Sequence, residues 1–166
     1  MKTIRYFLLA AFSAFLFSAC GPGGPQGAES GKEEAPIVDA DGTLLIKLNA
    51  DDHMRYDKLV LRAKAGQKVR LTLAHVGKGS VSAMGHDFVL LKEGVDAAKF
   101  AQKAALAAAT GFVPESEKEN VIAHTRMLGG GESDTIEFTV EKAGKYTYLC
   151  SFPGHFTTMR GELIVE

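Results

Sequence analysis

The chain has 166 residues, of which 46% are hydrophobic and 23% are charged. This length and apolar content suffice for one folded domain with its own core. The formal net charge of −1 argues against the basic surface that a nucleic-acid-binding domain needs, so we expect no nucleic-acid partner.

The chain begins with the pattern of an export signal. A short positive region, Lys2 to Arg5, precedes an apolar run that is too short to cross a bilayer as a helix. The run ends at Ser18-Ala19-Cys20, where small residues precede a cysteine as in the lipobox of bacterial lipoproteins. We therefore predict a lipoprotein-type signal peptide at residues 1–19 and lipidation of Cys20. A plain signal peptide, cut at the same place, is the alternative.

A polar segment follows the cysteine. Residues 21–35 are rich in Gly, Pro, Glu, Lys and Ser and contain no large apolar side chain. Such a composition cannot form a packed core and is typical of a disordered tether. We predict that residues 20–36 are the lipidated cysteine with its tether, and that the folded domain covers residues 37–166.

Period-two alternation of apolar and polar residues dominates this domain. In Lys68–His75, for example, Val69, Leu71 and Leu73 share one face. The pattern predicts strands at Thr43–Asn49, Lys58–Ala63, Lys68–His75, Phe88–Lys92, Thr135–Val140, Tyr146–Cys150 and Glu162–Val165. Several short strands separated by Gly-containing turns indicate an all-β sandwich or barrel.

One stretch departs from the strand pattern. Val95–Thr110 is rich in Ala, Lys and Gln and ends before Gly111, which predicts a helix with a glycine stop. Asp96 is placed to stabilise the N-terminal end of this helix. Together with residues 111–120, the helix forms an insertion between strands.

The last seventeen residues carry a metal-ligand pattern. Cys150, His155 and Met159 follow one another as Cys-x4-His-x3-Met between two predicted strands, and Pro153-Gly154 allows a tight bend. A thiolate, imidazole nitrogen and a weak axial thioether are the ligands of a blue-copper electron-transfer centre. That centre needs a second imidazole, for which His86 is the candidate.

These residues also allow other interpretations. Zinc accepts Cys and His, but thioether is a poor zinc ligand, so Met159 favours copper over zinc. Met159 as a plain core residue in a chance pattern is a further alternative. The chain has two cysteines; if Cys20 carries lipid, Cys150 is a lone thiol that only a metal would protect in an oxidising compartment. A Cys20–Cys150 disulfide is disfavoured, because Cys20 precedes a flexible tether.

Three further histidines lack this context. His53 lies in a polar turn, where we expect it to be exposed to solvent. His75 ends a predicted strand and fits a buried structural histidine better than a ligand. His124 fits a surface or hydrogen-bonded histidine.

At three places the sequence resembles the azurins of the cupredoxin family: Met84-Gly85-His86, Val121-Ile122-Ala123-His124-Thr125, and Cys150 to His155 with Met159. The resemblance covers about residues 44 to 166. It implies an eight-stranded, cupredoxin-like Greek-key β-sandwich with one short helical insertion. It also implies a single copper ion, bound trigonally by His86, Cys150 and His155, with Met159 and the Gly85 carbonyl as distant axial contacts.

The chain also departs from the azurin pattern. The cysteine expected near the start of the domain is absent, Trp is missing, Asp87 replaces the usual Asn, and Ser151 replaces the usual Thr. Asp87 and Ser151 belong to the outer shell, which tunes a metal centre. The reduction potential of azurins is therefore not transferable to this chain.

These observations predict a monomeric one-electron carrier in the periplasm or cell envelope, lipid-anchored to a membrane. Its expected partners are redox proteins such as c-type cytochromes or copper enzymes. We expect no enzymatic activity, because neither a second copper site nor an acid–base pair is visible. A copper chaperone or storage protein of the envelope is the alternative, although the five Met do not cluster. The predicted docking patch around His155 comprises Ala83, Met84, Pro153, Gly154 and Phe156.

Overall fold

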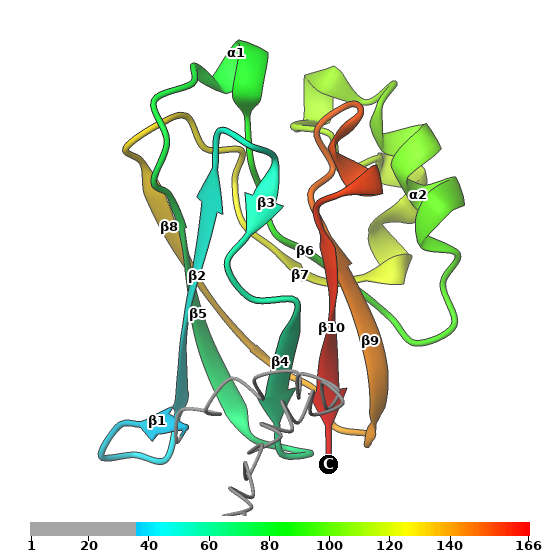
Figure 1. The fold of residues 1–166 in the computed structure, drawn as a ribbon. Helices are drawn as coiled ribbons and strands as arrows, with labels where there is room; N and C mark the ends of the chain where they lie inside the picture. The colour runs from blue at the N-terminus through cyan, green and yellow to red at the C-terminus, as the bar shows by residue number, and fades with distance from the viewer. Residues whose placement is uncertain (1–35) are drawn as a thin grey trace, which may run out of the picture. The chain divides into compact units, whose positions relative to one another are not determined.

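The computed structural model describes residues 36–166. The predicted signal peptide, Cys20 and all but the last residue of the predicted tether lie outside the described residues. In the described part, two sheets pack face to face, and a helical insertion lies beside one of them (Figure 1). The predicted β-sandwich with one helical insertion is confirmed.

The first sheet has the strand order β1-β2-β5-β8, and β3 pairs with another part of β2. Its strands are β1 (Ile37–Val38), β2 (Leu44–Asp51), β3 (Arg55–Tyr56), β5 (Lys68–His75) and β8 (Ser133–Thr139). The pairing of β2 with β5 is parallel, and the other pairings of this sheet are antiparallel.

The second sheet has the order β4-β10-β9-β6-β7. Its strands are β4 (Val60–Ala63), β6 (Val89–Leu91), β7 (Val121–His124), β9 (Gly144–Leu149) and β10 (Arg160–Val165). The pairing of β4 with β10 is parallel, and the other three pairings are antiparallel. Both sheets are therefore mixed.

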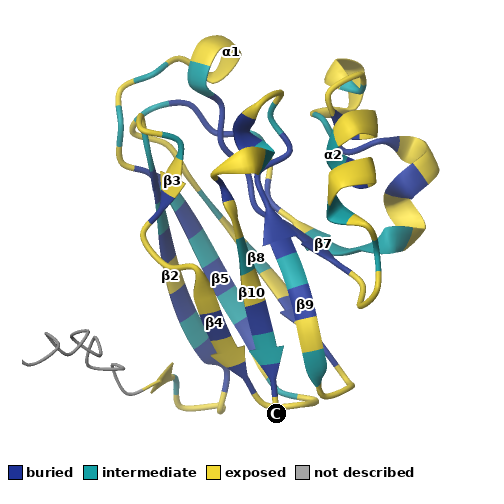
Figure 2. Ribbon diagram, turned by 45° about the vertical axis from the view of Figure 1, so that its right-hand side comes forward, coloured by how far each residue is buried: buried dark blue, intermediate teal, exposed yellow. Residues whose placement is uncertain are grey.

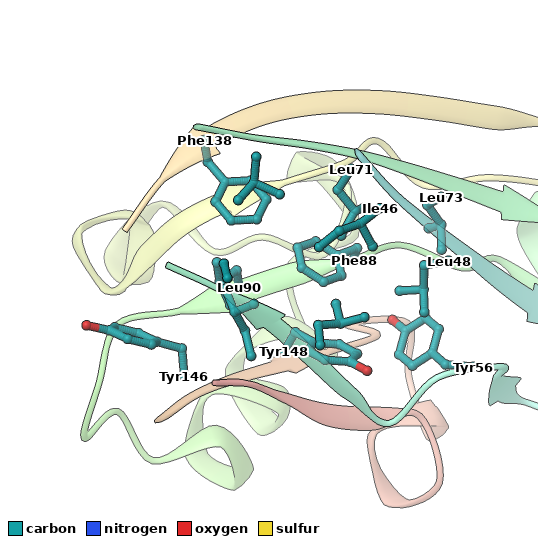
Figure 3. Close-up of a cluster of buried hydrophobic side chains, with 14 of the residues drawn as sticks. Ile46, Leu48, Tyr56, Leu71, Leu73, Phe88, Leu90, Phe138, Tyr146 and Tyr148 are labelled. Atoms are coloured by element: carbon teal, nitrogen blue, oxygen red, sulfur yellow. The ribbon is translucent and has the colours of Figure 1, made fainter. Parts of the chain in front are cut away.

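The main core lies between the sheets and follows from the period-two alternation. In β5, Val69, Leu71 and Leu73 are at most 1% exposed, whereas the residues between them are partly exposed. Opposing side chains from the second sheet, including Leu90 and Tyr148, complete this core (Figure 3). Burial of such side chains supplies most of the driving force for folding.

All seven predicted strands are confirmed: the bounds of Lys68–His75 agree, and those of the other six differ by one or two residues. The described residues contain ten strands, two more than the eight that the resemblance implies. The period-two pattern does not predict β1, β3 and β7. Strands β1 and β3 have only two residues each, and the sequence of β7, VIAH, does not alternate between apolar and polar residues.

The predicted helix over Val95–Thr110 is too long. The α-helix α2 covers only Ala97–Ala104, and a separate 3-10 turn, η1, covers Ala108–Thr110. The helix ends where its buried face ends, because Ala104 is buried and Leu106 is 90% exposed. Asp96 caps α2 as predicted and accepts hydrogen bonds from two backbone amides at 3.1 Å.

The insertion builds a second hydrophobic cluster against the outer face of the second sheet. Figure 2 shows that most of α2 is exposed or half-buried, and the buried residues of this helix are Phe100 and Ala104. A second 3-10 helix, η2 (Glu115–Asn120), returns the chain to β7. Within residues 36–166, no helix combines the length and apolarity needed to cross a membrane. The buried members of this cluster are Val89, Leu91, Phe100, Ala104, Val113 and Leu149.

Candidate metal centre

The loop after β9 carries three of the predicted ligand residues. Cys150 follows the last residue of β9, His155 opens the 3-10 helix η3 (His155–Thr157), and Met159 precedes β10. Backbone bonds close this loop: the Cys150 amide donates to the Met159 carbonyl at 3.0 Å, and the Met159 amide donates to the His155 carbonyl at 2.8 Å. Gly154 turns the chain with a φ of 85°, which favours glycine.

His86 comes from a different part of the fold. It lies between α1 (Val81–Met84) and β6, where it exchanges backbone hydrogen bonds with Leu128 at 3.0 and 2.8 Å. The residue before His86 must be glycine, because a Cβ on Gly85 would lie 2.5 Å from the carbonyl oxygen of Val81. The two ligand-bearing segments are thus fixed separately by backbone pairing.

The fold brings the side chains of His86, Cys150 and His155 together. One donor atom from each lies within 4.8 Å of the others, and all three residues are buried. Sγ of Cys150 is 3.6 Å from Nδ1 of His155. Within the described part of the chain, no other group of His, Cys, Asp or Glu has this arrangement.

The hydrogen bonding of His86 leaves one nitrogen free. Its Nε2 lies 2.9 Å from the backbone carbonyl of Asp51, whereas its Nδ1 is buried without a hydrogen-bond partner. A buried polar atom without a partner is costly, unless something outside the protein chain completes it. A metal ion bound by Nδ1 fits this arrangement, because the bond to Asp51 would fix the ring by its other nitrogen.

The electrostatics of the site favour metal-binding forms of the imidazoles. Burial, with repulsion from His86 and His75, lowers the pKa of His155 to about 4. Burial also lowers the pKa of His86, so both rings are neutral at pH 7. Burial and the nearby Asp87 raise the pKa of the Cys150 thiol well above its usual value. A thiolate at this position therefore needs a cation beside it, and a coordinating metal supplies one.

The two predicted axial groups come from the same two segments as the other predicted ligands, Gly85 beside His86 and Met159 in the loop that begins at Cys150. The carbonyl oxygen of Gly85 is 3.8 Å from Sγ of Cys150. Met159 is fully buried and belongs to the same hydrophobic cluster as Cys150. The structure thus brings all five predicted metal-site residues to one end of the sandwich.

An outer pair connects the two ligand-bearing segments. The carboxylate of Asp87 accepts hydrogen bonds from the Ser151 amide at 2.7 Å and from the Ser151 hydroxyl at 2.5 Å. The Tyr56 hydroxyl donates to the Asp87 carbonyl. Burial raises the pKa of the Asp87 carboxyl to about 6, although the hydrogen bonds from Ser151 oppose that shift. The residue after His86 and the residue after Cys150 therefore hold each other in place.

The remaining histidines lie where the sequence analysis expected them. The side chain of His53 is 77% exposed, and His124 is an exposed residue whose Nδ1 lies 3.0 Å from the Thr125 carbonyl. His75 is buried, and its ring lies 4.3 Å from that of His86. This contact could not be predicted from the sequence, because the position of His75 at the end of β5 does not show which residue its ring meets.

The residues of the predicted docking patch are exposed or half-buried. Ala83, Pro153 and Gly154 are exposed, and Met84 and Phe156 are half-buried. Phe156 also packs against the second hydrophobic cluster and lies 5.1 Å beneath the guanidinium of Arg160.

Comparison with known proteins decides the family. Residues 43–166 match the model of "Copper binding proteins, plastocyanin/azurin family". The chain belongs to this family. It is 39% identical to Azurin-2 of Alcaligenes xylosoxydans xylosoxydans over 120 residues, which cover 70% of this chain and 92% of that protein. It is 31% identical to Auracyanin-A of Chloroflexus aurantiacus over 169 aligned positions, which cover 99% of this chain and 98% of that protein.

Solved structures agree with this assignment. Auracyanin A, a "blue" copper protein from Chloroflexus aurantiacus, matches with a TM-score of 0.66 and 32% identity over 75% of this chain and all of that one. The azurin and auracyanin relatives, the family match and the cluster of His86, Cys150 and His155 agree on function. This cupredoxin is a blue copper electron-transfer protein. Cupredoxins are electron carriers that act with redox partners.

Proposed function

We propose that His86, Cys150 and His155 bind a single copper ion, with Met159 and the Gly85 carbonyl as distant axial contacts. One observation carries the assignment: Nδ1 of His86 is buried without a partner, in a group of three donors that lie within 4.8 Å of one another. Bound copper supplies the one-electron Cu(I)/Cu(II) couple. The chain's own residues supply a fixed, water-poor cage in which the donors need to move little.

The absorption spectrum of the copper-loaded chain tests this ligand set. Cu(II) should give an intense blue band, which arises from charge transfer from the Cys150 thiolate. Cys150→Ser should abolish the band and leave the β-sheet circular dichroism unchanged. His124→Ala, which removes an exposed imidazole, is the matched control and should keep the band. Retention of the blue band in Cys150→Ser would contradict the assignment.

Met159 should affect the reduction potential of the copper more than its binding affinity, because an axial thioether bond is long and weak. Met159→Gln should still bind copper and should show a lower reduction potential in voltammetry. If this variant loses all affinity for copper, Met159 is a primary ligand and the geometry differs from the one proposed.

We propose that the protein is a monomeric carrier, not an enzyme, and that electrons pass through the His155 imidazole at the docking patch. The apolar character of this patch and the single ligand cluster in the described residues support the proposal. Redox proteins such as c-type cytochromes or copper enzymes would be its partners. Ala83→Asp places a charge on the exposed patch and should slow electron self-exchange, because two copies must bring these patches together. An unchanged rate would place the route elsewhere.

We propose that the chain is held in the bacterial cell envelope by lipid on Cys20, after removal of residues 1–19. The lipobox-like sequence and the polar segment of residues 21–35 support this. More than one acyl chain, each contributing roughly 0.8 kcal/mol per buried CH2, would give stable anchoring. Wild type should sediment with membranes and incorporate labelled palmitate, and Cys20→Ala should do neither. A wild-type protein that is soluble and unlabelled would instead be a free periplasmic carrier.

The burial of all three donors favours a carrier over a copper chaperone or storage protein. A chaperone must hand its ion to another protein, so its donors need to be within reach of that protein. Copper transfer to a chelator should therefore be slow relative to electron self-exchange. Rapid metal transfer with slow electron exchange would favour the chaperone.

A further inference from the structure

The ring of Phe112, in the helical insertion, contacts the loop that carries Cys150 and His155. The ring centroid of Phe112 lies 5.4 Å from that of Phe152, and the rings are inclined by 60°. The Phe152 ring in turn lies 4.6 Å from the imidazole of His155, inclined by 41°. Both separations fall in the range of favourable aromatic pairs. Three rings therefore connect the insertion to a proposed copper ligand.

Phe152 is the non-ligand ring against which His155 packs. Among the described residues, the His155 ring has two aromatic neighbours, Phe152 and His86, and the centroid of His86 lies 5.0 Å away. His86 is itself a proposed ligand. Phe152 thus supplies the aromatic packing of the His155 imidazole from outside the proposed ligand set, and its other ring contact is Phe112.

The backbone at Phe112 is held in an unfavourable conformation. Its φ of 66° lies in the left-handed region, which bulky residues rarely adopt. Its amide donates to the Ala107 carbonyl at 2.9 Å, and the next residue, Val113, is 4% exposed within the second cluster. Strain of this kind persists only where the surroundings fix it. Packing of the insertion therefore fixes where the Phe112 ring lies.

We propose that Phe112 is a positioning residue for the copper centre, an inference that rests on the proposed ligand set. Its ring keeps Phe152 packed against His155, so the imidazole keeps its place when copper changes oxidation state or leaves. The same packing limits the access of water to the imidazole. Because water stabilises the more highly charged Cu(II), limiting its access raises the reduction potential.

Three substitutions in the full chain test this role. Phe112→Gly removes the ring, and glycine adopts a positive φ without a steric penalty, so the fold should be kept. Phe112→Leu keeps apolar bulk but lacks the aromatic ring. Leu106→Ala is the matched control, because Leu106 lies in the same insertion and is 90% exposed.

In Phe112→Gly, EDTA should remove Cu(II) about 2- to 10-fold faster than from wild type, the range expected for one aromatic contact. The reduction potential should fall. In the metal-free protein, the amide protons of Thr158 and Met159, which both bond to the His155 carbonyl, should exchange faster by a similar factor. Phe112→Leu should lie between wild type and Phe112→Gly, and Leu106→Ala should match wild type.

If copper release, reduction potential and amide exchange in Phe112→Gly all equal those of wild type, the proposal is overturned. It is also overturned if Leu106→Ala changes these quantities as much as Phe112→Gly does, because the cause would then be a general loosening of the insertion. If Phe112→Gly does not fold, Phe112→Leu decides: wild-type copper release and amide exchange in that variant overturn the proposal. The underlying function fails by a different result, namely a wild-type chain that binds Cu(II) without a blue band.

Discussion

The two hydrophobic clusters meet at β9 but differ in origin. Tyr148 and Cys150 belong to the main core between the sheets, and Leu149 between them belongs to the cluster beneath the insertion. The main core draws on strands from the whole domain. The second cluster comes from residues 89 to 121 together with Leu149 and Phe156. The strand that ends at the copper thiol is therefore packed on both faces, and each cluster can be weakened separately.

A substitution in the main core should have the largest effect on stability. Leu71 is fully buried in β5, so Leu71→Ala loses transfer free energy and leaves a cavity. The free energy of unfolding should fall by about 2–5 kcal/mol. Urea unfolding of the metal-free protein, followed by circular dichroism, measures it. A loss below about 1 kcal/mol would mean that the core can collapse around the cavity.

Weakening the second cluster should have a smaller and more local effect. Phe100 is 1% exposed and is the largest side chain that α2 buries. We expect the insertion to open without the sandwich, because its cluster is separate from the main core. Phe100→Ala should therefore lower the free energy of global unfolding by about 2 kcal/mol, less than the roughly 3–5 kcal/mol typical of a buried Phe. Hydrogen exchange should rise mainly between residues 95 and 120. Equal acceleration in β2 and β5 would show that the two clusters unfold as one unit.

The hydrogen-bonded pair of Asp87 and Ser151, beside the copper site, should contribute less to stability than either cluster. Ser151→Ala removes the hydroxyl that donates to the buried Asp87 carboxylate but keeps the backbone bond. The free energy of unfolding of the metal-free protein should fall by about 1–2 kcal/mol. Ser116→Ala, at an exposed position of η2, serves as the control. Equal values for the two variants would mean that the Ser151 hydroxyl bond contributes nothing net.

The smallest expected effect is the loss of stability at low pH that Glu117 causes. Hydrogen bonds from Lys103 and Asn120 lower the pKa of Glu117, which connects α2 to η2. A pKa lower in the folded than in the unfolded state stabilises the fold above the unfolded pKa, which is near 4.5. This stabilisation is lost as the pH falls through the folded pKa.

Glu117→Gln should therefore melt below wild type at pH 7, and the difference should shrink as the pH falls below 4.5. Thermal melts at several pH values measure it. A gap that is independent of pH would show that the carboxylate charge contributes nothing.

Local patterns predicted what depends on spacing along the chain. Alternation located β5, and the spacing of Cys150, His155 and Met159 indicated copper. Contacts through space escaped prediction: the pairing of His86 with Leu128, the ring contact of His75 with His86, and the contact of Phe112 with Phe152. The predicted helix also runs past the end of α2, because the alanine-rich residues 105–109 favour a helix by local propensity alone.

The parallel pairing of β4 with β10 bears on the order in which the molecule is assembled. It joins Val60 to Glu162, residues about one hundred positions apart in the chain. Such distant pairing is slow to form, because a long loop must close first. Cys150, His155 and Met159 lie just before this last strand, so the metal loop is closed at both ends only after the C-terminus has arrived. A chain truncated before Arg160 should fail to retain copper even though every proposed ligand is present.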